Sequence, residues 1–396
     1  MADAPRYSRR VSFNERLYLA ADRLKPGFCI QIVVEGVGLV PQDALAQAVA
    51  RAAEANPGAR LLLRGRLGFM RWVAIGPLPP VRRVEWPGGD GTAPEGLERP
   101  LQPGSGPTCE VVVAPGPTTH RLVFRCFHGV MDARGLLHFA EEVFRALRGE
   151  ALVGADSQLN DTEFIESKVG HRTRPAITSD RRTITGARSA RHSPVLWRRL
   201  ALSGPAPALA ARIATGLARH ATRFHATPTR VMIPVDLRHY DREIRTTGNL
   251  TYPLLLDVPA TQRWRDLQRD ILKRLIGKDP MRLDPGERIV PWLPLWLLTA
   301  VYALWTGHHR RTGRFPFAAL VTHLNLPDLS AVGGGGFRAD ALFFLPPQSD
   351  FIPLTVSAVS TPHATQVVVS APSGLIDAAG LADLCAVLSA SVRGDP

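Results

Sequence analysis

The feature that most constrains this chain's fold is a strand that runs directly into a helix over residues 120–148. Residues 120–127 (HRLVFRCF) form a short run in which apolar side chains predominate, as strands do. Residues 135–147 repeat apolar side chains at the spacing of one helical face. Because only residues 128–134 separate the two patterns, the segment predicts a strand, a tight turn and a helix in immediate succession.

Further strands and helices are predicted on both sides of this segment. Before it, the patterns predict strands at residues 28–34, 60–63, 70–75 and 109–114 and a helix at 41–56. After it, they predict helices at 207–221, 264–276 and 378–388 and strands at 230–235 and 250–258. Residues 76–106 are rich in Pro and Gly, which predicts a long surface excursion.

A polar and basic stretch divides the chain. With 396 residues, the chain is long enough for two domains or for one large two-lobed domain. Residues 161–199 are rich in arginine and poor in apolar side chains, which predicts a linker between lobes. A solvated surface segment of either lobe explains this pattern equally well. We therefore expect an N-terminal lobe at residues 1–160 and a C-terminal lobe at residues 200–396.

The net charge of +13 comes from arginine. Of the 48 basic residues only four are lysines, and 35 residues are acidic. Such a skew is typical of a GC-rich coding bias and does not by itself indicate a polyanionic partner. The sequence has no Cys/His finger, no aromatic RNP motif and no basic helix that leads into heptads. We therefore expect no nucleic-acid partner.

The cysteines and histidines predict neither a metal site nor a disulfide framework. Cys29, Cys109, Cys126 and Cys385 lie far apart, which excludes a zinc ribbon and a dense set of disulfides. The adjacent His308 and His309, and the pair His220 and His225, lack the spacing of metal ligands and have no acidic residues to support them, so no metal is expected. Residues 1–25 contain no long apolar run, so we expect no signal peptide and a cytoplasmic protein.

The turn between the strand and the helix carries the residues best suited to chemistry. His128 ends the predicted strand and Asp132 opens the predicted helix, so both lie on one tight loop. Histidine titrates near neutrality and can accept a proton from a hydroxyl or an amine. Asp132 can pair with a buried cation and fix the loop. A surface histidine followed by a helix-capping aspartate gives the same pattern without any chemistry.

With its flanks, this turn resembles the H-H-x-x-x-D-G motif of the chloramphenicol-acetyltransferase-like superfamily, which includes nonribosomal-peptide condensation domains and O-acyltransferases. Residues 232–238 (MIPVDLR) and 247–250 (TGNL) resemble the family's P-V-x-x-R and G-N pair. Residues 320–327 (LVTHLNLP) occupy the place of an S-N-x-G-like strand, and residues 27–57 resemble the family's opening. The closest resemblance is to freestanding alcohol or wax-ester/diacylglycerol-type O-acyltransferases.

The resemblance implies a mixed α/β fold of the α+β type, with two chloramphenicol-acetyltransferase-like lobes, each a mixed sheet with helices, and a tunnel between them. An acyl-CoA or acyl-phosphopantetheine donor would meet an alcohol or amine acceptor in this tunnel, with no tightly bound cofactor. His128 would be the general base, and Asp132 would support the loop by pairing with Arg238. The resemblance implies that the tunnel is lined by Phe127, Gly129, Ala133, Asn249, Thr322 and Asn325.

Two positions depart from the family's pattern. Phe127 stands where the family has its first histidine, and Ala133 stands where it has glycine, which adds a Cβ where backbones approach closely. These departures leave open a non-catalytic relative that acts as a binding or scaffold protein. Another alternative is a freestanding condensation enzyme that forms an amide. Because no carrier domain fits into 396 residues, we expect any acyl carrier protein to act in trans. We also expect the chain to be a monomer.

Residues 289–305 form an apolar run of 17 residues without a charged side chain. A membrane span needs about 20 residues, and Pro291 and Pro294 interrupt the run, so we do not expect it to span. It is either a buried helix that lines an acyl tunnel, which we favour, or a partly exposed helix that makes peripheral contact with a membrane through its tryptophans. A similar helix precedes the S-N-type strand in the wax-ester/diacylglycerol enzymes, which favours lipid-like acyl chains in lipid or secondary-metabolite biosynthesis.

Overall fold

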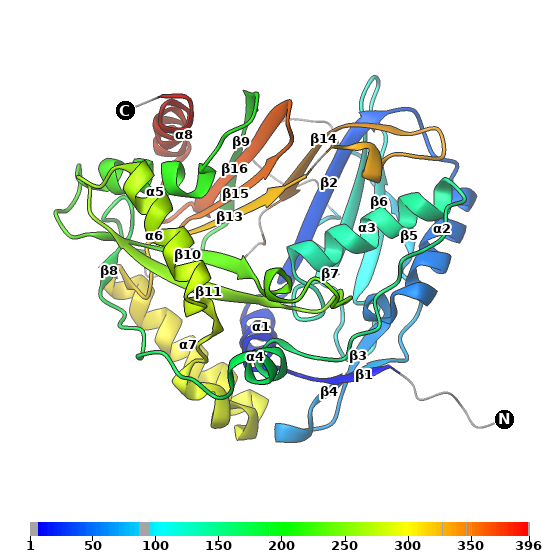
Figure 1. Ribbon diagram of the computed structural model, residues 1–396, viewed down its shortest axis with the longest axis horizontal. Coiled ribbons are helices and arrows are strands. Elements are labelled where there is room, and N and C mark those ends of the chain that lie inside the picture. Colours follow the sequence, from blue (N-terminus) through cyan, green and yellow to red (C-terminus); the bar gives the residue numbers. More distant parts are fainter. Residues whose placement is uncertain are drawn as a thin grey trace.

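The computed structural model describes residues 7–86, 96–189, 191–326, 328–345, 347, 349 and 351–394. Two mixed β-sheets lie at an angle to each other, and helices cover their outer faces (Figure 1). A smaller sheet and further helices close the molecule at the bottom of this view (Figure 1). The architecture is therefore the expected mixed α/β fold with two lobes.

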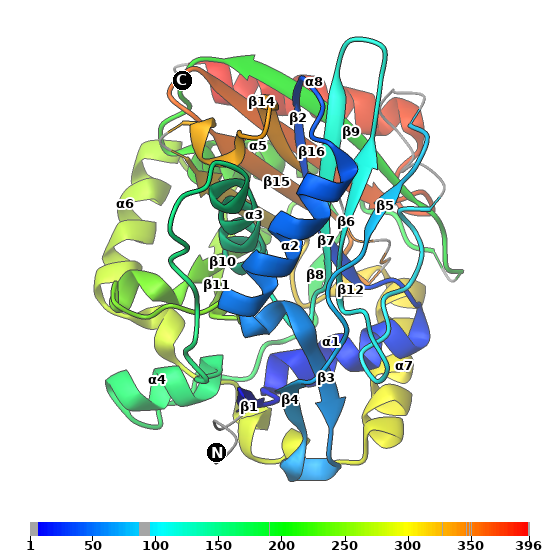
Figure 2. The same ribbon diagram turned by 90° about the vertical axis from the view of Figure 1, so that its right-hand side faces the viewer.

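The first lobe is built on a five-stranded sheet with the order β14-β2-β7-β6-β5. Its strands are β14 (Arg338–Leu345), β2 (Cys29–Val37), β7 (His120–Phe127), β6 (Cys109–Ala114) and β5 (Val81–Arg83). β5 and β6 pair in parallel, and the other neighbours are antiparallel. Helices α2 (Gln42–Ala55) and α3 (Ala133–Leu147) lie side by side in front of this sheet in Figure 2. The strand, turn and helix predicted over 120–148 are confirmed.

The second lobe is built on a six-stranded sheet with the order β11-β10-β13-β15-β16-β9. Its strands are β11 (Thr251–Val258), β10 (Thr229–Asp236), β13 (Ala319–Asn325), β15 (Thr355–Ser360), β16 (Ala364–Pro372) and β9 (Val195–Ser203). Helices α5 (Leu209–Ala221) and α8 (Ala378–Arg393) pack on this sheet, and α6 (Trp264–Ile276) packs on α5. The helices predicted at 207–221 and 264–276 are confirmed, and the C-terminal helix is longer than predicted.

Apolar clusters hold the layers together, as burial of apolar surface is the main force that stabilises a fold. One cluster fills the space between the five-stranded sheet and helices α2 and α3. A second lies between the six-stranded sheet and its helices. A third packs one sheet against the other through Val33, Trp197, Phe343 and Val368. This third cluster fixes the two lobes relative to each other.

Two smaller sheets and three further helices complete the molecule, and they come from several parts of the chain. They are a three-stranded sheet of β1 (Ser8–Arg10), β4 (Arg71–Ala74) and β3 (Leu61–Arg64), a two-stranded sheet of β12 (Arg314–Phe315) and β8 (Arg181–Arg182), and helices α1 (Phe13–Leu24), α4 (Asp161–Val169) and α7 (Leu295–Thr312). A capping box of Ser12 and Glu15 starts α1, satisfying two of its first N–H groups. Helix α1 packs against α7.

Two strands do not follow the predicted division into residues 1–160, 161–199 and 200–396, which itself stays a prediction. β14 pairs antiparallel with β2, so a strand from the C-terminal part of the chain completes the sheet of the first lobe. β9 begins at Val195, inside the stretch expected to be a linker, and pairs with β16 over its whole length. Local side-chain patterns do not record which distant strand is the partner.

The buried helix that we favoured for residues 289–305 is wrong for most of that run. Helix α7 begins only at Leu295, after Pro294, and among its residues only Leu298, Thr306 and His309 are buried. An apolar run shows that burial would be favourable, but it does not show that another element covers every face. None of the helices in the described part of the chain is long and apolar enough to cross a membrane.

Candidate active site

The His128 loop, residues 128–132, joins the end of β7 to the start of α3. β7 pairs with β2 on one side and β6 on the other, so the strand that carries the loop lies inside the sheet. The His128 N–H donates to the carbonyl of Phe28 over 3.0 Å. At the other end, the Asp132 carboxylate accepts the N–H of Gly135 at 2.8 Å and caps α3. Both ends of the loop are therefore fixed by the backbone.

The imidazole of His128 is held in one tautomer by the loop itself. Its Nδ1 lies 3.1 Å from the carbonyl oxygen of Met131. Because a carbonyl can only accept, Nδ1 carries the proton and Nε2 presents a lone pair. Tyr18 and Phe28 stack on the ring with centroids at 4.6 and 5.6 Å. Burial among these groups lowers the pKa of His128 below its ordinary value of 6.5.

Asp132 is paired with Arg238, as the resemblance implied. The two Asp132 oxygens lie 3.2 and 3.0 Å from the Arg238 guanidinium, which also donates to the Gly248 carbonyl at 2.7 Å. The same carboxylate accepts the N–H of Leu250 and the hydroxyl of Thr251, each at 2.9 Å. Burial raises the pKa of Asp132, but the charge and hydrogen bonds of Arg238 outweigh it and hold this pKa below its ordinary range. The loop is thus tied to the second lobe by a buried ion pair.

Asn249 holds the other side of the loop. Its amide nitrogen donates to the carbonyl of His128 at 3.0 Å and to the carboxylate of Glu15 at 3.1 Å. Both of its side-chain hydrogens are therefore used, so Asn249 fixes the backbone of the loop and has no side-chain N–H left to stabilise an oxyanion. Glu15 in turn forms a fully buried ion pair with Arg9 at 2.6 Å, and Arg9 donates to the carbonyl of Val130 at 3.1 Å.

Close packing brings helix α3 onto the segment that contains Asn249. A Cβ on Gly135 would overlap the carbonyl oxygen of Thr247, and a Cβ on Gly58 would overlap the hydroxyl of the same residue. Glycine is therefore required at position 135 by this contact. Ala133 is half-buried and packs against the core of the first lobe. The close backbone approach expected at Ala133 occurs two residues later.

The residues predicted to line a tunnel differ in their burial. Phe127 is fully buried in the core of the first lobe, with its ring 6.1 Å from that of Trp72, so it faces no channel. Gly129 is buried as well, and a Cβ there would overlap the Phe127 ring. Thr322 is half-buried within β13, and Asn325 is exposed at its end. Among the described residues, no hydrogen bond links either of these two side chains to His128.

Glu15 and Tyr18, which both come from α1, were not predicted as site residues from the sequence. The signal that could have found the helix is the Ser12-x-x-Glu15 capping box, which starts a helix and places Tyr18 one turn later. Tyr18 then reaches the ring of His128, while Glu15 reaches Asn249. Helix α1 therefore contributes both a wall of the site and an anchor for the loop.

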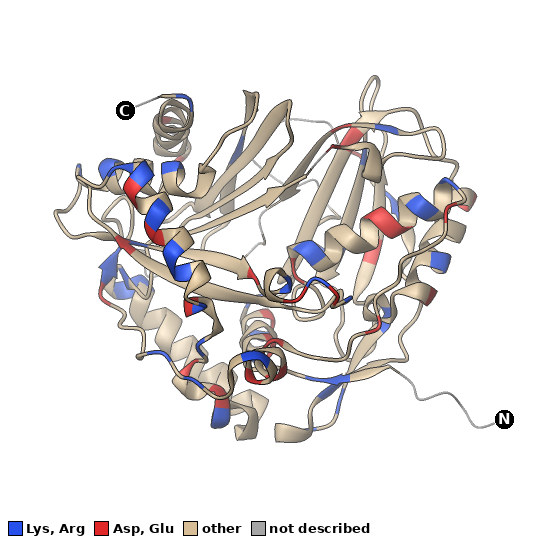
Figure 3. Cartoon of the chain, in the orientation of Figure 1, with Lys and Arg blue, Asp and Glu red and all other residues tan. Residues whose placement is uncertain are grey.

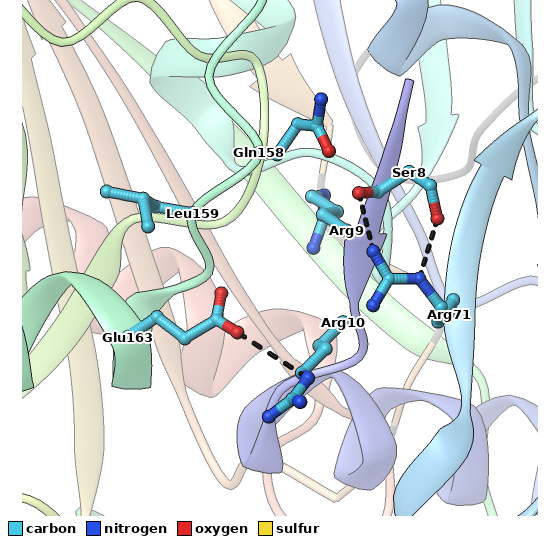
Figure 4. A pocket seen from close by; sticks show the side chains of 7 residues that line it. All are labelled: Ser8, Arg9, Arg10, Arg71, Gln158, Leu159 and Glu163. Carbon is cyan, nitrogen blue, oxygen red and sulfur yellow. Dashed lines mark hydrogen bonds and ion pairs between the residues drawn. The ribbon is translucent and has the colours of Figure 1, made fainter. Parts of the chain in front are cut away.

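A cavity of about 290 Å³ lies beside β1. It is lined by Ser8, Arg9, Arg10, Arg71, Gln158, Leu159 and Glu163 (Figure 4). Arg9 connects the cavity to the His128 loop through its hydrogen bond to Val130. The tunnel between the lobes stays a prediction. Within the described ranges, no three His, Cys, Asp or Glu side chains are grouped so that they could hold a metal ion.

Solved structures that resemble this one are condensation domains of synthetases. The starter condensation domain of rhizomide synthetase RzmA, as a double mutant in complex with C8-CoA and Leu-SNAC, aligns with a TM-score of 0.64 and 16% sequence identity over 97% of this chain and 93% of that chain. The first condensation domain of the calcium-dependent antibiotic synthetase, in complex with a substrate analogue, aligns with a TM-score of 0.67 and 16% identity over 98% and 96%. The chain has the condensation-domain fold.

The structural similarity covers nearly the whole of each chain, but the sequences are only 16% identical. No protein-family model matches the chain, and no curated protein matches its sequence. At 16% identity the similarity shows the fold, and the reaction must be argued from the site. A special closeness to wax-ester or diacylglycerol acyltransferases stays a prediction.

Proposed function

We propose that this protein transfers an acyl group from a CoA or carrier-protein thioester to an amine or an alcohol, with His128 as general base. The observation that carries the proposal is the hydrogen bond from His128 Nδ1 to Met131, which leaves Nε2 unprotonated on a ring whose pKa is lowered by burial. A neutral imidazole of this kind can take a proton near neutral pH. The complexes of the RzmA domain with C8-CoA and Leu-SNAC support the thioester as donor class.

In the proposed reaction, the acceptor's nitrogen or oxygen attacks the thioester carbonyl while His128 Nε2 removes its proton. The tetrahedral intermediate then collapses, the carbon–sulfur bond breaks, and the imidazolium returns the proton to the leaving thiolate. Products are an amide or ester and a free thiol. No acyl-enzyme is needed, because holding both reactants beside one base supplies the proximity.

Asp132, Arg238 and Asn249 are positioning residues in this proposal. Asp132 and Arg238 bind each other and the backbone around the loop, and Asn249 binds the carbonyl of His128. Their hydrogen bonds keep the imidazole in the orientation that exposes Nε2. A buried network of hydrogen bonds of this kind makes the loop rigid.

Phe127 and Ala133, the two departures that left open a non-catalytic relative, do not argue against catalysis at this site. Phe127 is a core residue, and Ala133 stands where no close backbone approach forbids a side chain. An amide-forming enzyme that receives its donor from a carrier protein in trans fits the same site, and the identity of the acceptor distinguishes it from an O-acyltransferase. The expected monomer, cytoplasmic location and absence of a nucleic-acid partner are kept as parts of the proposal.

The proposal is tested by supplying a panel of acyl-CoA and acyl-carrier thioesters with amine and alcohol acceptors and measuring release of free thiol. The wild type is expected to release thiol only when an acceptor is present, and mass spectrometry identifies the amide or ester. His128→Ala is expected to lower the rate about 10²- to 10⁴-fold.

Two further variants make this result specific. His128→Asn keeps a side-chain N–H for the Met131 carbonyl but has no basic nitrogen, so it is expected to be as inactive as His128→Ala. His239→Ala removes an exposed histidine and is expected to keep full activity. Equal thiol release by the wild type and His128→Ala would remove His128 from the mechanism.

A further inference from the structure

One surface of the molecule exposes an unusual number of large apolar side chains. Helix α7 and the segment before it expose Ile289, Trp292, Trp296, Leu304 and Trp305, and the turn between β3 and β4 adds Phe69. Trp296 is 68% exposed, Phe69 73% and Leu304 77%. We call these six residues the tryptophan face. Contiguous apolar surface of this kind marks an interaction site on a folded protein.

The two parts of the tryptophan face are joined into one surface. The Phe69 and Trp292 rings meet edge to face with centroids 5.7 Å apart. Behind them, the buried guanidinium of Arg16 donates to the carbonyl of Leu67 at 3.1 Å and to the carbonyl of Leu293. The turn and the segment before α7 are therefore held together by α1, and both lie at the bottom of the molecule in Figure 1.

The two segments that carry this face are rich in arginine and poor in acidic residues. Residues 285–312 contain a single acidic residue, Glu287, which is buried, and three arginines. Residues 64–71 contain three arginines and no acidic residue. Figure 3 shows the same contrast, because α7 is free of charged residues along most of its length and carries arginines at its end. Exposed Arg66, Arg288 and Arg311 flank the apolar side chains.

We infer that the tryptophan face docks this protein on the surface of a membrane that contains anionic lipids. Tryptophans favour the boundary between headgroups and acyl chains, and an interfacial helix buries one apolar face while it lies in the plane of the membrane. The flanking arginines match anionic headgroups in charge. A second copy of this chain would bring the same arginines against one another, so charge disfavours a symmetric dimer through this face.

Docking would place the site close to the membrane. The inner side of α7 packs against α1, and α1 carries the Tyr18 ring that stacks on His128. One helix therefore separates the docked surface from the wall of the candidate active site. The inference concerns binding and does not depend on the proposed reaction.

The experiment is co-sedimentation of the purified chain with vesicles of phosphatidylcholine alone and of phosphatidylcholine with one third phosphatidylglycerol. We expect the wild type to bind the anionic vesicles and to bind the neutral vesicles more weakly. Trp296→Ser combined with Leu304→Ser is expected to lower partitioning about tenfold for each side chain lost. Arg311→Ala is expected to lower binding to anionic vesicles about fivefold and to change binding to neutral vesicles little.

Leu39→Ser is the matched control, because Leu39 is also exposed but lies in the connection between β2 and α2, far from α7 in Figure 1. It should bind like the wild type. The inference is overturned if the wild type does not sediment with anionic vesicles, or if the double variant sediments as well as the wild type. It is also overturned if the wild type is a dimer without affinity for vesicles that the double variant converts to a monomer.

Discussion

Helix α1 contacts two regions that differ in how completely their side chains are bonded. On one side is the His128 loop, where Asp132 alone accepts hydrogen bonds from Arg238, Gly135, Leu250 and Thr251. On the other side is α7, where most large side chains contact water. The first region is typical of a site whose geometry must not change, and the second of a surface that is completed by something else.

The comparison shows that the hydropathy of a single residue does not reveal whether it packs in the core or faces the solvent. Phe127 occupies the place of a family histidine and is part of the core, whereas the tryptophans of α7 belong by hydropathy to a core and lie outside it. The role of each residue follows from the groups that its side chain contacts. Five experiments test the difference between the two regions.

The largest effect is expected from Asp132→Ala. Removing this carboxylate leaves Arg238 with Asp236 as its remaining carboxylate partner and takes the acceptor from the buried N–H groups of Gly135 and Leu250. Together these losses cost about 3–5 kcal/mol of unfolding free energy. Chemical denaturation measures the loss, and thiol release should fall with it. The control is Asp241→Ala, which breaks the exposed pair with Lys168 and should lower stability far less. Similar losses in both variants would mean that the loop is not specially held.

A pair of helical glycines tests packing in the two regions directly. Gly135→Ala forces a Cβ onto the Thr247 carbonyl and should cost about 1–3 kcal/mol. Gly307→Ala on α7 meets no atom within 4 Å, so it should stabilise the protein by about 0.5–1 kcal/mol through helix propensity. Thermal or urea unfolding of both variants gives the comparison. Effects of the same sign would contradict it.

Glu287 lies at the boundary between the regions and should make stability depend on pH. Burial and the nearby charge of Asp161 raise the pKa of Glu287 from 4.5 to about 8. The folded state then holds a proton that the unfolded state releases, so stability falls as pH rises from about 4.5 to 8, by up to about 1.4 kcal/mol for each pH unit. Glu287→Gln should flatten this slope. An unchanged slope in denaturation curves across this range would show that another group causes it.

The smallest effect on stability is expected on the tryptophan face. Because Trp296 and Leu304 are mostly exposed, Trp296→Ser and Leu304→Ser should each change the unfolding free energy by no more than about 0.5 kcal/mol. This near-neutrality is what allows vesicle binding to be measured without loss of the fold. A large loss of stability in either variant would mean that the free protein covers this face.

Local sequence patterns predicted the elements that depend on local forces. The helices at α2, α3, α5 and α6 and the strands around the His128 loop follow from side-chain periodicity and turn residues. The pairing of β14 with β2 and of β9 with β16 joins segments far apart in the chain, which no local pattern encodes. The exposure of α7 also could not be predicted, because it depends on which of its faces other elements cover in the folded chain.

The candidate site was predictable to a similar extent. His128 and Asp132 were identified from one loop, and Arg238 from a resemblance. Glu15 and Tyr18 reach the loop from α1, more than 100 residues earlier in the chain, so only the fold brings them there. Asn249 was predicted as a tunnel residue, and the structure shows an anchor for the loop.

The most direct test of the central claim is an NMR titration of the His128 imidazole, with His128→Ala used to assign its signals among the 12 histidines. The predicted result is a neutral ring protonated at Nδ1, with a pKa below 6.5. A ring protonated at Nε2, or a pKa above 6.5, would contradict the account, because His128 would then not present a free basic nitrogen at neutral pH.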